Sequence, residues 1–200
     1  MFQLPPPKAR RLDRPTMLLM MGVSGVGKTT TGRRVAKALG WSFRDADDFH
    51  PPENVAKMSS GQPLTDADRW PWLAAIGNWL DLQRTIGGNA VVTCSALRRS
   101  YRTMLLHDRP DVKLVFLKGS KALIADRLSR RSGHFMPPAL LESQFATLEE
   151  PRRDERALVV SVALPPRHVV ADIVRYFDPD NPMLSANVPR PVRRSERRRP

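Results

Sequence analysis

The stretch Gly22-Val-Ser-Gly-Val-Gly-Lys-Thr-Thr30 (GVSGVGKTT) decides the fold. It satisfies the pattern G-x-x-x-x-G-K-S/T, and it stands between an apolar run, Thr16–Met21, and a segment of helical periodicity, Lys28–Leu39. The glycines let the backbone curl so that successive N–H groups point inward, and the following helix adds the positive end of its dipole. The motif therefore predicts a phosphate-binding loop, and a glycine-rich turn without a ligand is the weaker interpretation.

The side chains of this loop favour a nucleoside triphosphate and a metal ion as ligands. Lys28 is expected to reach the β- and γ-phosphates of ATP, and the Thr29 hydroxyl is expected to coordinate Mg²⁺, with Thr30 as the weaker candidate. The predicted nucleotide-binding residues are Gly22, Val23, Ser24, Gly25, Val26, Gly27, Lys28, Thr29 and Thr30.

Short apolar runs of β type alternate with helical patterns along the chain. The expected strands are Thr16–Met21, Trp41–Arg44, Ala90–Cys94, Lys113–Leu117 and Ala157–Val162. The expected helices are Lys28–Leu39, Pro71–Ile86 after a Thr65-x-x-Asp68 start signal, Arg99–His107, Lys121–Arg131, Pro138–Leu148 and His168–Tyr176. This alternation predicts a three-layer α/β sandwich, in which helices cover both faces of a five-stranded parallel sheet.

The net charge of +13 is concentrated at the two ends of the chain. Residues 1–15 carry +3 and residues 179–200 carry +4, which leaves +6 for residues 16–178. Both ends are rich in Pro and Arg and lack aliphatic periodicity, so we expect basic disordered tails around one kinase domain. Because arginine clusters contact phosphates without sequence specificity, a polyanion-binding protein is the alternative from another class. The phosphate-binding loop makes a primary nucleic-acid role the weaker of the two hypotheses.

The cellular compartment is predicted from three absences. The only cysteine, Cys94, has no partner for an intrachain disulfide, and the N-terminus lacks the apolar stretch of a secretory signal. The longest apolar run, Met17–Val23, is much shorter than the roughly 20 residues that span a bilayer. We expect a cytoplasmic protein without a membrane segment.

Two further features favour a small-molecule kinase among the proteins with such a loop. The Asn-Lys-x-Asp of guanine-specific GTPases is missing, and the third predicted strand ends in Cys94-Ser95 rather than in an acidic residue. The second strand leads into Asp45-Ala-Asp-Asp48, where Asp45 and Asp47 would share one face of an extended segment. Such carboxylates can position Mg²⁺ and a substrate hydroxyl, although a solvated loop with a helix cap has the same composition.

The basic stretch Arg127-Leu-Ser-Arg-Arg-Ser-Gly-His134 predicts a lid over residues 127–138. Arg127 and Arg131 are four residues apart, so they would lie on one helical face, and Gly133 would allow the segment to bend. The alternative is a solvated basic helix surface.

Several segments together resemble the gluconokinase family, one of the P-loop small-molecule kinases that include shikimate and adenylate kinases. These segments are GVSGVGKTT (22–30), DADDFHPPENVAKMSSGQPLTDADRWPWL (45–73), CSALRRSYR (94–102), LKGS (117–120), RRSGHFMP (130–137) and QFATLEEP (144–151). The resemblance spans residues 17–177 and implies the strand order 2-3-1-4-5, Mg-ATP as donor, D-gluconate as acceptor, 6-phosphogluconate as product and usually a homodimer. Ala46 stands where the family usually has glycine between the paired acids.

The resemblance also implies roles for single residues. Asp45 would lie near Mg²⁺ together with Thr29, and Asp47 would hold and deprotonate the acceptor hydroxyl. The implied catalytic residues are Lys28, Asp47, Arg127 and Arg131. The carboxylate of gluconate requires basic side chains, and the candidates are His50, Arg69, Arg98 and Arg102, with Arg98 and Arg69 ranked highest. Each of these can instead be an ion-pair partner on a helix surface. Another kinase of the same fold, such as a shikimate kinase, is the alternative enzyme.

Overall fold

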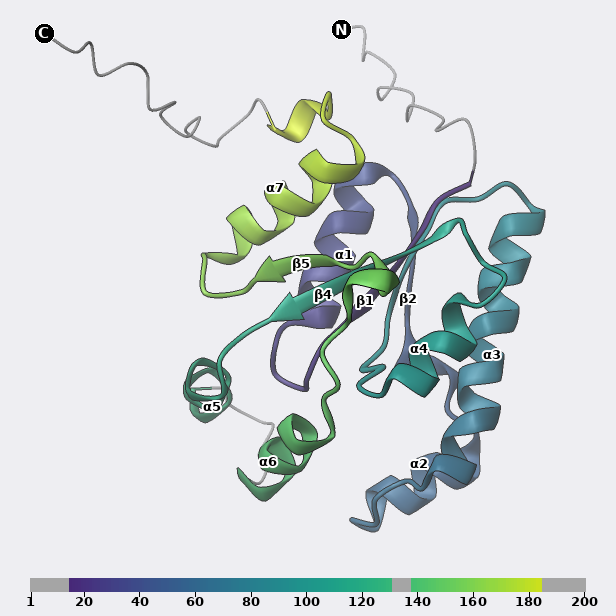
Figure 1. The fold of residues 1–200 in the computed structure, drawn as a ribbon, viewed down its shortest axis with the longest axis vertical. Helices are drawn as coiled ribbons and strands as arrows, with labels where there is room; N and C mark the ends of the chain where they lie inside the picture. Colours follow the sequence, from purple (N-terminus) through teal and green to yellow (C-terminus); the bar gives the residue numbers. More distant parts are fainter. Residues whose placement is uncertain (1–14, 131–137, 185–200) are drawn as a thin grey trace, which may run out of the picture.

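The structure, a computed structural model, describes residues 15–130 and 138–184 and contains one sheet of five strands (Figure 1). The strands are β1 Met17–Met21, β2 Ser42–Asp45, β3 Ala90–Thr93, β4 Val112–Lys118 and β5 Leu158–Ser161. They follow the order β2-β3-β1-β4-β5 across the sheet, and every neighbouring pair is parallel. The predicted order and the all-parallel sheet are confirmed.

Helices cover both faces of this sheet. They are α1 Lys28–Leu39, α2 Pro52–Ser59, α3 Asp66–Thr85, α4 Arg99–Leu106, α5 Lys121–Ser129, α6 Pro138–Thr147 and α7 Pro166–Phe177, with the 3₁₀ turns η1 Ala46–Phe49, η2 Arg153–Glu155 and η3 Pro182–Leu184. α1 and α7 pack against one another on one face, and α3 and α4 do so on the other. The predicted three-layer sandwich is therefore present.

Successive side chains of β1 contribute to the two halves of the core in turn. Leu18 and Met20 belong to the apolar cluster beneath α1 and α7, whereas Met17, Leu19 and Met21 belong to the cluster beneath α3 and α4. All five are fully buried, as expected for a central strand whose side chains alternate between two covered faces. The strand order changes direction beside β1, and open parallel sheets bind ligands at the carboxyl ends of strands at such points.

α3 begins at Asp66 and not at Pro71, where the sequence analysis placed its start. The Thr65 hydroxyl accepts a hydrogen bond from Asp68 N–H, and the Asp68 carboxylate accepts one from Thr65 N–H, so the start signal is a complete capping box. Pro71 lies inside the helix, where its missing N–H removes one backbone hydrogen bond. The earlier start places Asp66 and Arg69 on a helix. α2 was not predicted at all.

The folded body extends beyond residue 178. The predicted disordered tail from residue 179 is contradicted as far as residue 184, because Asn181 is buried and its Nδ2 donates to the Ala38 carbonyl of α1 at 3.1 Å. The Asn181 side-chain oxygen also accepts from Met183 N–H at 3.0 Å and so starts η3. The remaining tail residues, 1–14 and 185–200, lie outside the described residues, as do lid residues 131–137. Within the described chain no helix is long and apolar enough to cross a membrane.

Candidate active site

The phosphate-binding loop connects β1 to α1 at the middle of the sheet. Gly22, Gly25 and Gly27 have φ angles of 146°, 80° and 97°, which other residues rarely adopt. A side chain at Gly25 would also lack space, because an added Cβ would lie 2.8 Å from Leu128 of α5. Glycine is therefore required for both the curl of the loop and its close contact with α5.

Lys28 is the first residue of α1, and its side chain turns back into the loop. Its Nζ donates to the carbonyl oxygens of Gly22 at 3.0 Å and Val23 at 3.2 Å. Burial lowers the pKa of Lys28, while the nearby carboxylates of Asp47 and Asp45 act in the opposite direction. An ammonium group held by two neutral carbonyls can exchange them for phosphate oxygens, which are stronger acceptors because they are charged.

Thr29 and Asp45 join the start of α1 to the end of β2. The Thr29 hydroxyl donates to Asp45 Oδ2 at 2.7 Å, so the two residues predicted to face a metal ion are in contact. Among residues 15–130 and 138–184, no group of three or more His, Cys, Asp or Glu side chains is placed to hold a metal ion. Two oxygen-bearing side chains fit Mg²⁺, which commonly takes one or two protein oxygens beside phosphates and water.

Asp47 lies in η1, a 3₁₀ turn, and not in the extended segment that the sequence analysis assumed. The prediction that Asp45 and Asp47 share one face of an extended segment is therefore wrong. The two carboxylates nevertheless remain neighbours. Asp45 Oδ1 accepts from Asp47 N–H at 3.3 Å, and burial together with the Asp45 charge raises the pKa of Asp47. Trp72 Nε1 fixes the turn by donating to the Ala46 carbonyl at 2.7 Å. Asp48 forms an ion pair with Arg44, whose Nη1 lies 3.8 Å from Asp48 Oδ2.

His50 lies close enough to Asp47 and Arg69 for both of their charges to act on it. Its ring stacks on Trp72, with ring centres 4.3 Å apart and planes 9° from parallel. Asn54 Nδ2 lies 3.5 Å from His50 Nδ1 and donates to the Asp68 carbonyl at 2.8 Å. Burial lowers the pKa of His50, Asp47 raises it and Arg69 lowers it. The net lowering favours a neutral imidazole at pH 7.

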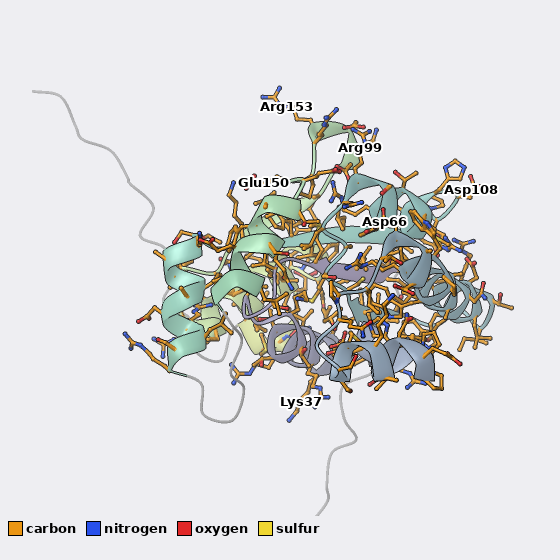
Figure 2. The ribbon with its side chains drawn as sticks, turned by 90° about the horizontal axis from the view of Figure 1, so that it is seen from below. Lys37, Asp66, Arg99, Asp108, Glu150 and Arg153 are labelled. Carbon is orange, nitrogen blue, oxygen red and sulfur yellow. The ribbon has the colours of Figure 1, made fainter. Side chains whose placement is uncertain are left out.

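Arg69 of α3 and Arg98, which precedes α4, meet at the carboxylate of Asp66. Arg98 Nη1 lies 2.6 Å from Asp66 Oδ2, and Arg69 Nη1 lies 3.5 Å from Asp66 Oδ1. The Tyr101 hydroxyl donates to Asp66 Oδ1 at 2.6 Å. Figure 2 shows Asp66 and Arg99, the neighbour of Arg98, on the side of the molecule opposite Lys37. The two arginines therefore share one carboxylate, that of Asp66.

Arg102 does not belong to this cluster, although the sequence analysis included it among the substrate ligands. Its side chain is 1% exposed and binds the Glu155 carboxylate with Nε at 2.5 Å and Nη2 at 2.9 Å. Its Nη1 donates to the carbonyls of Ala96 and Leu97, both at 3.1 Å. Burial acts to raise the pKa of Glu155, but hydrogen bonds from Arg102 and from Arg152 N–H lower it. We therefore correct the role of Arg102 from substrate ligand to support of the 96–98 backbone.

The lid residues are only partly described. Arg127 Nη2 donates to the carbonyl oxygen of Val162 at 2.5 Å. Val162 is the residue that follows β5. α5 ends at Ser129. Arg131, the predicted partner of Arg127, lies outside the described residues, as does His134. The pairing of Arg127 with Arg131 therefore stays a prediction. Thr30 is exposed in the first turn of α1.

Three residues at the site were not singled out from the sequence. Asp66 and Tyr101 complete the arginine cluster, and Gln144 of α6 binds Ser24 of the phosphate-binding loop. All three lie inside the family-like segments, which were the available signal.

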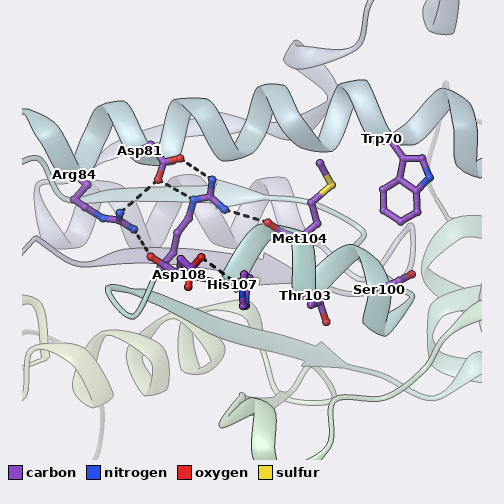
Figure 3. Close-up of a pocket in the computed structure, with 9 residues that line it drawn as sticks. Trp70, Asp81, Arg84, Ser100, Thr103, Met104, His107 and Asp108 are labelled. Carbon is purple, nitrogen blue, oxygen red and sulfur yellow. Dashed lines mark hydrogen bonds and ion pairs between the residues drawn. The ribbon is translucent and has the colours of Figure 1, made fainter.

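A cavity of about 780 Å³ lies elsewhere, between α3 and α4 (Figure 3). It is lined by Trp70, Asp81, Arg84, Ser100, Thr103, Met104, His107, Asp108 and Arg109. Its two arginines form ion pairs, Arg109 with Asp81 at 2.6 Å and Arg84 with Asp111 at 2.9 Å, as the arginines of the predicted acceptor site do with Asp66. None of the lining residues belongs to the phosphate-binding loop or to the predicted acceptor site. The candidate active site is therefore the carboxyl edge of the sheet and not this cavity.

Comparison with known families places this geometry among small-molecule kinases. The family model for shikimate kinase matches residues 24–163. The gluconokinase of Gluconobacter oxydans (strain 621H) is 51% identical over 168 residues, which cover 84% of this chain and 94% of that relative.

Solved structures separate the two kinase types. The crystal structure of a gluconokinase from Sinorhizobium meliloti 1021 matches with a TM-score of 0.71 at 48% identity, and the match covers 78% of this chain and 87% of that chain. A shikimate kinase from Bacteroides thetaiotaomicron matches with a TM-score of 0.60 at 16% identity, covering 81% of this chain and 98% of that chain. The likeness to the shikimate kinase shows a shared fold, whereas the first similarity extends to the sequence.

Proposed function

We infer that this chain, which belongs to the gluconokinase family, transfers the γ-phosphoryl group of ATP to D-gluconate and forms 6-phospho-D-gluconate. The observation that carries this conclusion on the acceptor side is the meeting of Arg69 and Arg98 around a carboxylate, beside His50 and Asp47. A sugar acid offers both groups that this arrangement suits, a carboxylate for the arginines and a hydroxyl for Asp47.

On the donor side, we propose that the loop from Gly22 to Thr30 holds the triphosphate. Its N–H groups and the start of α1 supply partial positive charge, and Lys28 moves from the Gly22 and Val23 carbonyls to the β- and γ-phosphates. Thr29 and Asp45 would hold Mg²⁺, which, when bound, neutralises charge on the phosphates. We also propose that Arg127 and Arg131 approach the phosphates from the lid.

On the acceptor side, we propose that Asp47 accepts the proton of the reacting hydroxyl. The hydroxyl oxygen forms a bond to the γ-phosphorus while the bond from that phosphorus to the leaving oxygen of ADP breaks, and the proton passes to the Asp47 carboxylate. Asp47 must be ionised to act in this way, and its raised pKa brings it closer to the pH at which a general base works best. Arg98 and Arg69 would orient gluconate through its carboxylate.

Two broader properties belong to the same proposal. We propose a homodimer, as the family resemblance implies, and a cytoplasmic location, which suits a chain whose single cysteine is a buried free thiol. Sedimentation equilibrium of the full chain tests the dimer, and a monomer at micromolar concentration would contradict it.

The acceptor is tested with a coupled assay of ADP release. We expect kcat/KM to be highest for D-gluconate and much lower for D-glucose, shikimate and AMP. Glucose is the matched control, because it retains the 6-hydroxyl but lacks the carboxylate that Arg69 and Arg98 would bind. A preference for shikimate would disprove gluconate as the acceptor while leaving the kinase fold and donor site intact.

A further inference from the structure

The segment after α6 contacts both halves of the active site. We call residues 144–155 the strap; they run from Gln144 in α6 to Glu155 in η2. At one end the strap contacts the phosphate-binding loop, and at the other it contacts the loop that carries Arg98. None of the roles proposed above uses the strap.

The donor-side contact is a two-point hydrogen bond between Gln144 and Ser24, which are 120 positions apart in the chain. Ser24 N–H donates to Gln144 Oε1 at 2.7 Å, and Gln144 Nε2 donates to Ser24 Oγ at 3.1 Å. Both ends of the amide are thus used on one residue of the loop. The amide thus serves Ser24 both as an acceptor and as a donor.

Apolar contacts accompany this hydrogen bond, because Phe145 and Leu148 of the strap pack against the apolar cluster to which Val23 of the loop belongs. A cavity of about 160 Å³ separates the strap from Val23 of the loop and from the end of β4. It is lined by Val23, Phe116, Leu117, Lys118, Gly119, Phe145, Leu148 and Glu150. The apolar packing between the strap and the loop is therefore incomplete at this cavity, and the Gln144 amide adds a polar link from the strap to the loop.

The acceptor-side contact holds the backbone on both sides of Arg98. Glu149 N–H donates to the Leu97 carbonyl at 2.9 Å, and Arg99 N–H donates to the Glu149 carboxylate at 2.5 Å. The buried Arg102 binds the Leu97 carbonyl as well and is itself held by Glu155 of the strap. Figure 2 shows Arg99 and Glu150 on the same side of the molecule. Only five positions separate Gln144 from Glu149.

We infer that Gln144 is a positioning residue which, through the strap, holds the phosphate-binding loop at a set distance from Arg98. This inference rests on the proposed function, since Arg98 orients the acceptor only if the protein phosphorylates a sugar acid. Phosphoryl transfer depends on the alignment of donor and acceptor, and a displacement of about 1 Å can lower the rate about 100-fold. Gln144 touches neither reacting group, so it acts through Ser24.

The first test compares Gln144→Ala with Glu142→Ala, a control on the same helix. Glu142 is exposed and pairs with Lys121 of α5, so its removal loosens α6 without touching the loop. We expect Gln144→Ala to lower kcat about tenfold and to change the KM for ATP by less than about threefold, because the rest of the loop still binds the phosphates. Glu142→Ala should leave both constants unchanged. An unchanged kcat in Gln144→Ala, with active wild-type protein, would overturn the inference.

The second test does not depend on gluconate. Amide hydrogen exchange of the peptide covering residues 22–27, measured without nucleotide, should be about tenfold faster in Gln144→Ala than in wild type and unaltered in Glu142→Ala. Equal exchange in all three proteins would also overturn the inference. Absence of ADP release by wild-type protein with gluconate would instead refute the proposed function, and the exchange result would still decide whether Gln144 holds the loop. In the Ser24→Ala background, Gln144→Ala should have a smaller effect on kcat, because the two residues act as a pair.

Discussion

The phosphate-binding loop takes its donors from consecutive residues, Gly22–Thr30, and most of them are backbone N–H groups, whereas the acceptor site takes single side chains from separate elements. Asp47 comes from η1, Arg69 from α3 and Arg98 from the residue before α4. A backbone cradle needs only glycines and the right turn, so it survives most side-chain changes. A cluster of side chains needs buried support behind each member. The two regions should therefore fail in different ways when they are mutated.

The largest expected effect comes from removing Lys28, the main side chain of the donor region. Lys28→Ala should lower kcat about 1000-fold, because it removes a positive charge that stabilises the transferring phosphoryl group in a partly buried site. The protein should remain folded, since the Lys28 ammonium binds carbonyls of its own loop. The measurements are steady-state ADP release and circular dichroism. Lys37→Ala, an exposed lysine at the other end of α1, is the control. Near-normal turnover by Lys28→Ala would remove the loop from the mechanism.

The second prediction sharpens the comparison inside the acceptor region, where Arg98 and Arg102 lie one helical turn apart. Arg102→Met should lower the free energy of unfolding by about 3 kcal/mol, because it leaves the Glu155 carboxylate buried without its partner. Arg98→Met should change stability little, since Arg98 and Asp66 are both more than 40% exposed, and should raise the KM for gluconate about tenfold. Urea unfolding and steady-state kinetics measure the two quantities.

A further variant separates loss of a charge pair from loss of packing at Arg102. Arg102→Met combined with Glu155→Met removes both charges, so it should recover part of the lost stability. Equal stability losses for Arg98→Met and Arg102→Met would contradict the division between a surface ligand and a buried support.

The third prediction compares the two carboxylates between the regions. Asp47→Asn should lower kcat about 100-fold while ATP still binds, because an amide cannot accept the hydroxyl proton. Asp45→Asn should chiefly raise the Mg²⁺ concentration needed for half-maximal rate, since the Asp45 carboxylate accepts the hydrogen bond from the Thr29 hydroxyl. Titrations of Mg²⁺ and gluconate on both variants, with nucleotide affinity measured separately, provide the test. Identical behaviour of the two variants would contradict the assignment of separate roles.

The comparison also explains which parts were predictable from sequence. The position and the curled backbone of the donor loop were predictable, because a contiguous glycine pattern between a strand and a helix determines its own local geometry, whereas its binding of nucleotide stays a prediction. The strand order needed the family resemblance, since alternation alone predicts a parallel sheet but not its order. The start of α3 was misplaced although its capping box was visible, because Pro71 was given more weight than the cap.

The acceptor site was harder because burial decides which arginines are available. Arg98 and Arg102 read alike in the sequence, and only the fold shows Arg102 enclosed with Glu155, 53 positions away. Gln144 and Ser24 are likewise brought together by the fold from opposite halves of the chain. Such long-range pairs have no local pattern, so sequence reasoning could at most mark the family-like segments that contain them.

The smallest expected effect concerns the stability of the acceptor region as a function of pH. Burial and the charge of Asp45 raise the pKa of Asp47 above its ordinary value of 3.8. A carboxyl group whose pKa is raised by folding binds its proton more tightly in the folded chain, so it contributes stability below its ordinary pKa and loses that contribution as pH rises through the raised value. At pH 7 the ionised Asp47 therefore lowers stability. Asp47→Asn should raise Tm at pH 7, on the order of 1 °C because the residue is only partly withdrawn from solvent, and this gain should vanish toward pH 4.

Thermal unfolding between pH 4 and pH 8 tests this prediction, with Asp48→Asn as the matched control. Asp48 lies next to Asp47 in the same turn, but its carboxylate pairs with Arg44, so removing its charge should not stabilise the protein at pH 7. A Tm gain in Asp47→Asn that is the same at pH 4 and pH 7 would show that shape and not charge is responsible. A pH-dependent gain in Tm together with a loss of kcat would show that the negative charge of Asp47 lowers stability and is required for the reaction. In the donor region, a substitution of Thr29 should not raise Tm while it lowers kcat, because the Thr29 hydroxyl carries no charge.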